Sequence, residues 1–143
     1  MADAISIVMI EDDEGHARLI EKNIRRAGVN NEIIGFETGA TALDHLLGSE
    51  SRDSLRGRSV VLLDLNLPDM TGMYVLRRLK ADKRTRKLPV FILTTTDDKG
   101  EIEKCYDLGA NAYITKPLNY DSFAYAIRQL GLFLSVIQTP EIE

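Results

Sequence analysis

Short apolar runs alternate along the chain with longer segments in which apolar residues recur every three or four positions. A continuous apolar run of about five residues is typical of a β-strand buried on both faces, and the longer spacing is typical of an amphipathic helix. We predict five strands, over residues 5–10, 32–36, 59–63, 89–93 and 112–115. We predict five helices, over residues 17–27, 40–47, 73–80 and 99–108 and from Tyr120 onward.

The strict alternation of strands and helices predicts an α/β fold. Right-handed crossovers between successive strands produce a parallel sheet that is covered by helices on both faces. No G-x-G-x-x-G sequence follows the first strand, which argues against dinucleotide binding. We therefore expect a flavodoxin-like, doubly wound, five-stranded parallel sheet with strand order 2-1-3-4-5 and five helices. Residues 48–57 are polar and rich in turn formers, which predicts an exposed loop.

Length and composition limit the function classes. A chain of 143 residues has the size of one domain, and we expect this domain over residues 1–131, with a helical extension and tail over 132–143. A net charge of −4 gives no basic surface for nucleic acid or an anionic membrane. One cysteine excludes an intrachain disulfide and a multi-cysteine metal site. The N-terminal segment lacks the basic region of a signal peptide, and no apolar run could span a membrane, so we expect a cytoplasmic protein.

Candidate chemistry lies where the predicted strands end. In an open α/β sheet, ligands bind beyond the carboxyl ends of the strands. Four strands that the predicted order places side by side are each followed there by polar side chains, namely Glu11, Asp12 and Asp13, then Asp64, then Thr94, then Lys116. We expect these carboxylates, the hydroxyl and the ammonium to converge on one site.

The predicted group of side chains fits phosphoryl transfer. Closely packed carboxylates repel one another unless a cation or proton intervenes, and oxygen ligands suit Mg²⁺. An aspartate beside Mg²⁺ can attack phosphorus, a lysine can neutralise phosphoryl charge and a threonine hydroxyl can bond a phosphoryl oxygen. Each residue alone has a simpler explanation, such as a helix cap at Asp13 or a strand former at Thr94. Their occurrence together at four strand ends favours the functional interpretation.

Four segments in this order resemble the response-regulator receiver family of two-component signalling. They are IEDDE at 10–14, LLDLNLPDMTG at 62–72, ILTTT at 92–96 and YITKP at 113–117. The resemblance extends over about residues 5–130. Pro68 and Gly72 match the loop that follows the phosphoacceptor in this family.

The resemblance implies a role for each residue. Asp64 would accept a phosphoryl group from a sensor histidine kinase, and the chain would signal through conformational change and protein–protein contacts without acting as an enzyme on other substrates. The implied Mg²⁺ ligands are Asp12, Asp64 and the backbone carbonyl of Asn66, with Glu11 acting through water. The other implied features are a switch hydroxyl at Thr94, a charge-neutralising Lys116, an aromatic switch at Tyr113 and a cis peptide between Lys116 and Pro117.

The single-domain form, the LLDLNLP sequence and the TTT run are most similar to regulators that partner bacterial phytochromes. Two departures stand out: Thr95 replaces the usual small residue, which could restrict access to Asp64, and the loop before the third strand is long. One alternative is a phosphohydrolase of the haloacid-dehalogenase type, but Asn66 stands where its second aspartate is needed. A receiver that serves only as a scaffold is a further alternative, and the intact set of site residues argues against it.

The apolar residues of the last predicted helix indicate a homodimer. Phe123, Ile127, Leu130, Leu134 and Ile137 form one stripe at spacings of three or four, and Leu132, Phe133 and Val136 add apolar surface on other faces. A helix over residues 120–138 would be about 28 Å long, whereas a strand spans about 17–20 Å. We expect the overhanging end to form a two-fold interface through Leu130, Leu132, Phe133, Leu134, Val136 and Ile137. The alternative is an arm that folds back over its own domain.

Overall fold

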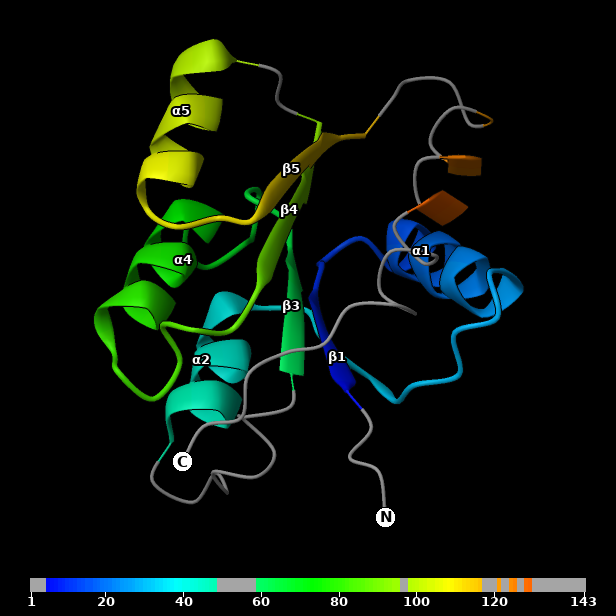
Figure 1. Ribbon diagram of the computed structural model, residues 1–143, viewed down its shortest axis with the longest axis horizontal. Helices are drawn as coiled ribbons and strands as arrows, with labels where there is room; N and C mark the ends of the chain where they lie inside the picture. The colour runs from blue at the N-terminus through cyan, green and yellow to red at the C-terminus, as the bar shows by residue number, and fades with distance from the viewer. Residues whose placement is uncertain are drawn as a thin grey trace.

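Five strands form one parallel sheet at the centre of the protein (Figure 1). The structure, a computed structural model, describes residues 5–48, 59–95, 98–116, 121, 124–125 and 128–129. The strands are β1 Ser6–Ile10, β2 Ile33–Phe36, β3 Ser59–Leu63, β4 Val90–Thr94 and β5 Ala112–Thr115. They lie in the order β2-β1-β3-β4-β5, which confirms the predicted order, and every strand end lies within one residue of its predicted position.

The described residues contain four of the five predicted helices as complete elements. These are α1 Glu14–Arg26, α2 Gly39–Leu47, α4 Gly72–Ala81 and α5 Lys99–Asp107. The fifth predicted helix is described only at residues 121, 124–125 and 128–129, where the backbone is helical. In the described part of the chain, no helix is long and apolar enough to cross a membrane. The predicted loop lies outside the described residues from Ser49 to Gly57.

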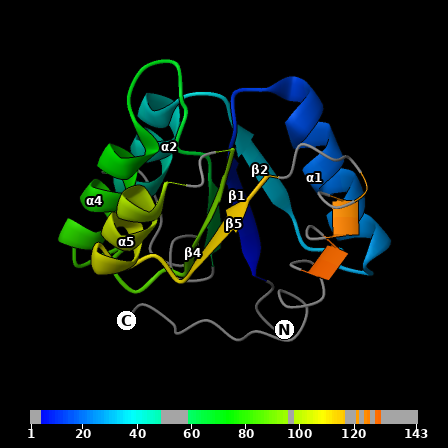
Figure 2. The same cartoon turned by 90° about the horizontal axis from the view of Figure 1, so that it is seen from above.

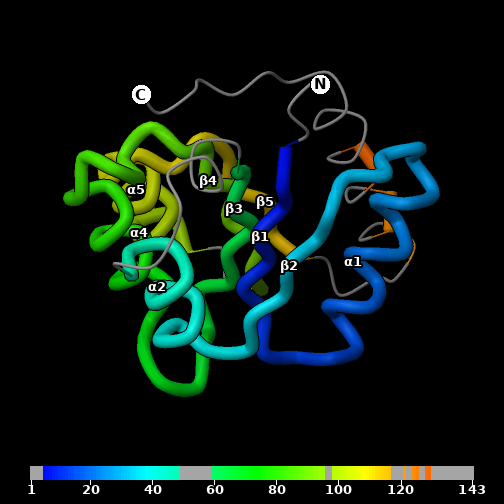
Figure 3. The backbone as a smooth tube through the Cα atoms, turned by 90° about the horizontal axis from the view of Figure 1, so that it is seen from below, coloured from blue at the N-terminus to red at the C-terminus, as the bar shows by residue number. Residues whose placement is uncertain are grey.

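The sheet separates two apolar cores. Helices α2, α4 and α5 cover one face, and α1 and the described residues after 120 cover the other (Figures 2 and 3). Residues that alternate along the strands point into opposite cores: Val8 and Ile10 contribute to the core beneath α2 and α4, and Ile7 and Met9 to the core beneath α1. All five residues of β3 and of β4 are buried, as expected for central strands with helices on both faces.

Helix α1 begins three residues before its predicted start, because Asp13 caps it. The Asp13 carboxylate accepts a hydrogen bond of 2.9 Å from the backbone N–H of His16. The helix ends before Gly28, whose φ of 90° favours glycine. Gly109, with φ of 108°, follows α5 in the same way. Local sequence signals therefore set both ends of α1.

The single cysteine lies in the core between α4 and α5. Cys105 has no exposed surface, and its thiol donates a hydrogen bond of 3.3 Å to the sulfur of Met73. Burial raises the pKa of the Cys105 thiol to about 11. Cys105 therefore has the structural role expected of a buried cysteine.

Gly72, the first residue of α4, packs directly on the backbone that carries Asp64. A Cβ at Gly72 would lie 2.4 Å from the carbonyl oxygen of Asp64 and 2.6 Å from Cα of Leu65. At this position the N–H of Gly72 donates a hydrogen bond of 2.9 Å to the Leu65 carbonyl. A side chain at residue 72 would therefore force the two backbone segments apart.

We expect Gly72→Ala to lower the free energy of unfolding by about 1–3 kcal/mol, because backbone atoms must shift to admit the methyl group. The matched control is Gly35→Ala in β2, where a Cβ would meet only the Met9 methyl group, at 4.0 Å. This control should change stability by less than about 0.5 kcal/mol. Urea unfolding of both variants measures the difference, and equal stabilities would contradict the close approach at Gly72.

Candidate functional site

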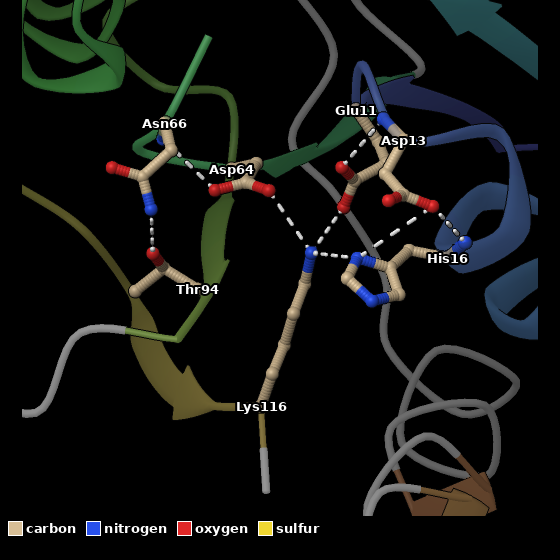
Figure 4. A network of polar contacts seen from close by, with 7 residues as sticks. All are labelled: Glu11, Asp13, His16, Asp64, Asn66, Thr94 and Lys116. Atoms are coloured by element: carbon tan, nitrogen blue, oxygen red, sulfur yellow. Dashed lines mark hydrogen bonds and ion pairs between the residues drawn. The ribbon is translucent and has the colours of Figure 1, made fainter. Parts of the chain in front are cut away.

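The polar residues that follow β1, β3, β4 and β5 lie together at one edge of the sheet (Figure 4). The strand order brings Glu11, Asp64 and Lys116 within hydrogen-bonding distance, although Lys116 is 105 and 52 residues from the other two. Thr94 joins the same group through Asn66. The predicted convergence of these side chains is therefore present in the structure.

The ammonium of Lys116 lies at the centre of the group. It donates hydrogen bonds to Oε1 of Glu11 and, over 2.9 Å, to Oδ2 of Asp64. The exposed fractions of the three side chains are only 4% for Lys116, 2% for Glu11 and 7% for Asp64. A buried charge is tolerated when it is paired and hydrogen-bonded, and Lys116 and the two carboxylates meet this condition together.

His16 is the third partner of Lys116, with 3.2 Å between Nδ1 and the ammonium nitrogen. Its ring lies at the edge of the site, between Lys116 and the Asp13 carboxylate (Figure 4). His16 was not among the site residues predicted from the sequence. The one available signal was its position, one helical turn after Asp12 at the start of α1.

The second carboxylate oxygen of Asp64 faces the loop between β3 and α4. Oδ1 accepts a hydrogen bond of 2.9 Å from the backbone N–H of Asn66. The Asn66 side-chain amide donates over 3.3 Å to the hydroxyl of Thr94, which has no exposed surface. Asn66 thus connects the end of β3 to the end of β4, and Asp64 is held from both sides.

Three carboxylates form a cluster that could hold a divalent cation. Glu11, Asp12 and Asp64 each offer an oxygen, and these oxygens lie within 4.8 Å of one another. Oxygens on opposite sides of one bound Mg²⁺ or Ca²⁺ are about 4–5 Å apart, so the cluster has suitable dimensions. Asp12 is exposed while the other two are buried, which leaves the cluster accessible from solvent on one side. The donor set, all hard oxygen, fits Mg²⁺ chemically.

Burial raises the pKa of Glu11 from 4.5 to about 7. The hydrogen bond from Lys116 opposes this rise, and the negative charge of Asp64 adds to it. Between pH 4.5 and about 7 the Glu11 carboxyl is protonated in the folded chain and ionised in the unfolded chain. Its contribution to the stability of the cation-free fold is therefore lost as the pH rises through this range.

Comparison with known proteins identifies the family. The profile of the response regulator receiver domain matches residues 7–128. The chain belongs to this family. The members of this family are response regulators of two-component signalling, so the chain belongs to a family of signalling proteins. This membership leaves the alternative of a dehalogenase-type phosphohydrolase without support.

Solved structures of related receivers share the whole fold. A response regulator receiver domain from Rhodospirillum rubrum is 65% identical, with a TM-score of 0.91, and the match covers 97% of this chain and 99% of that one. The phosphorylated cyanobacterial phytochrome response regulator RcpA is 28% identical, with a TM-score of 0.82 and coverages of 97% and 99%. The Mn²⁺-bound form of response regulator Rcp1, a protein of Synechocystis, is 25% identical, with a TM-score of 0.84 and coverages of 95% and 99%.

The remaining residues that the sequence singled out lie in different parts of this receiver. Asp13 caps α1, which was the simpler of its two interpretations. Tyr113 is half-buried in β5 and packs against the core beneath α2 and α4. Thr95 is exposed directly after β4. Pro117, and with it the predicted cis peptide, lies outside the described residues. The predicted dimer residues also lie outside them, namely Leu130, Leu132, Phe133, Leu134, Val136 and Ile137.

We expect Lys116→Gln to raise the pKa of Glu11 above 7, because the substitution removes the hydrogen bond and the positive charge that now lower it. Carbon NMR titration of the Glu11 carboxyl in cation-free buffer measures the shift. Lys104→Gln, an exposed position on α5, is the matched control and should leave this pKa unchanged. A Glu11 pKa that falls or stays constant in Lys116→Gln would show that Lys116 does not stabilise the ionised carboxyl.

Proposed function

We propose that this receiver accepts a phosphoryl group on Asp64 from a sensor histidine kinase and signals through the resulting change in its surface. The observation that carries the proposal is the buried Lys116 ammonium, 2.9 Å from a carboxylate oxygen of Asp64 at the carboxyl ends of the strands. A buried lysine beside an aspartate and next to an acidic cluster is the combination that an aspartyl phosphate needs for charge neutralisation.

The proposed cofactor is Mg²⁺, held by Asp12, Asp64 and the backbone carbonyl of Asn66, with Glu11 acting through water. Support comes from the spacing of the three carboxylates and from the Mn²⁺-bound form of the related Rcp1. When bound, the cation supplies positive charge that offsets carboxylate repulsion and phosphoryl charge. The exposed carboxylate of Asp12 lies on the side from which a solvated cation can enter.

In the proposed transfer, a carboxylate oxygen of Asp64 attacks the phosphorus of a phosphohistidine. The new bond is an acyl phosphate, and the phosphorus–nitrogen bond breaks as the kinase imidazole leaves and takes up a proton. Lys116 bonds the phosphoryl oxygens in place of part of its present contact with Asp64. The donor is already activated, so the residues of the receiver contribute mainly positioning and charge neutralisation.

The proposed switch involves Thr94 and Tyr113. The Thr94 hydroxyl, now bonded by Asn66, turns to donate to a phosphoryl oxygen on Asp64. Tyr113 lies in the neighbouring strand, where it pairs with Ile92, two residues before Thr94. In the proposed switch, its ring moves into the space that the Thr94 side chain leaves. Phosphorylation then biases an equilibrium between two surfaces of the receiver.

The proposed kinase partner is a bacterial phytochrome, and the proposed location is the cytoplasm. Support for the partner comes from RcpA, a phytochrome response regulator whose structure aligns over 97% of the length of this chain. We further propose that residues 1–131 form the receiver and residues 132–143 a C-terminal extension.

We expect Asp64→Asn to abolish phosphoryl uptake, because the amide retains the shape of the side chain and loses the nucleophilic carboxylate. The measurement is transfer of radiolabelled phosphoryl from an autophosphorylated sensor histidine kinase with Mg²⁺ present. Asp107→Asn, the same change at an exposed position of α5, is the matched control and should accept phosphoryl at the wild-type rate. Uptake of hydroxylamine-sensitive phosphate by Asp64→Asn would refute the assignment, and no uptake by the wild type from any histidine kinase would favour a scaffold.

We also propose a homodimer formed through the apolar C-terminal residues. Truncation after Gly131 removes Leu132, Phe133, Leu134, Val136 and Ile137, and the expected product is a folded monomer. Light scattering at high micromolar concentration compares the truncated and full-length chains. A full-length chain that is monomeric under these conditions would support the alternative, an arm that folds back over its own domain.

A further inference from the structure

A carboxylate in the loop between β3 and α4 is hydrogen-bonded to another helix, α2. Asp69 accepts hydrogen bonds of 2.9 Å from the backbone N–H groups of Gly39 and Ala40, one on each of its oxygens. Gly39 and Ala40 are the first two residues of α2, where backbone N–H groups lack partners within the helix. These bonds join positions that are 30 and 29 residues apart in sequence.

Helix α2 already has a cap from its own sequence. The side chain of Thr38 accepts a hydrogen bond of 3.2 Å from the N–H of Thr41. Asp69 satisfies different N–H groups, so it adds to the local cap without replacing it. The two N–H groups also lower the pKa of Asp69, because their hydrogen bonds stabilise the ionised carboxylate.

The residue next to Asp69 fits closely against the same turn of α2. A Cβ at Gly39 would lie 2.5 Å from both Cγ and Sδ of Met70 and 3.1 Å from a methyl group of Val75. The Met70 side chain therefore occupies the space that a Cβ at position 39 would need. Two independent contacts, one polar and one apolar, hold the tip of the loop on α2.

The base of the same loop belongs to the candidate site. Asn66 bonds Asp64 through its backbone and Thr94 through its side chain, and it forms a bridge with Thr71. The N–H of Gly72 bonds the carbonyl of Leu65 and closes the loop. The segment is thus tied to the sheet at its base, through Asn66, and to α2 at its tip, through Asp69.

We infer that Asp69 is a positioning residue for the divalent-cation site, because it holds the Asn66 loop against the first turn of α2. This inference rests on the proposed function, in which the Asn66 carbonyl is a ligand. Without Asp69 the loop would sample more conformations, and cation binding would have to order it. Because coupling between sites is reciprocal, cation binding in turn strengthens the attachment of the loop to α2.

The test is a Mg²⁺ titration of the intact chain at a pH of about 8, where Glu11 is mostly ionised. We expect Asp69→Ala to weaken Mg²⁺ binding by about tenfold, the range seen for groups that orient a ligand. The matched control is Thr38→Ala, which removes a cap from the same helix without touching the loop. Thr38→Ala should lower the midpoint of thermal unfolding by a few degrees and leave Mg²⁺ affinity unchanged. Asp69→Asn, which loses the charge and one acceptor, should fall between wild type and Asp69→Ala.

A second readout separates positioning from a general loss of stability. Addition of Mg²⁺ should slow hydrogen exchange at the amides of Gly39 and Ala40 in wild type and in Thr38→Ala, and it should have no such effect in Asp69→Ala. Equal Mg²⁺ affinities for Asp69→Ala and wild type would overturn the role of Asp69 alone. A wild-type chain that binds no Mg²⁺ would instead overturn the proposed cation site, and with it this inference.

Discussion

The buried ammonium of Lys116 is the interaction on which the rest of the site depends. It is held by Glu11 from the end of β1 and by Asp64 from the end of β3, so three separate strands must be in place to satisfy it. Removing one member of a buried charged group commonly costs several kcal/mol, since the others are left without a partner. The polar group therefore favours the same strand order that the two apolar cores require, and a wrong order would be penalised at both places.

Much of the fold could be predicted because it follows from local pattern. The runs of four apolar residues in β3 and in β4 identified central strands, and positive φ at Gly28 and Gly109 agrees with the predicted helix ends. The start of α1 was predicted three residues late, because the apolar stripe begins at Ala17 whereas the backbone turns at the Asp13 cap. Helix starts follow from capping, and apolar periodicity alone does not locate them.

The residues of the candidate site could likewise be predicted only in part. Glu11, Asp64 and Lys116 could be selected because parallel strands place their carboxyl ends at one edge of the sheet, whatever the details of packing. His16 and Asp69 were missed because their contacts depend on how a helix and a loop are oriented, which the order of the strands does not determine. An exposed aspartate in a loop looks the same in sequence whether it faces water or caps a distant helix. Only the three-dimensional arrangement distinguishes the two.

The environment of Cys105 has a practical consequence for the study of this receiver. With a pKa of about 11, only about one thiol in ten thousand is ionised at neutral pH, and no surface of the residue is exposed to solvent. Oxidants and maleimide reagents act on an accessible thiolate, so the native cysteine should be inert toward both. Fluorescent or spin labels can therefore be attached at introduced surface cysteines while Cys105 and its contact with Met73 are left in place.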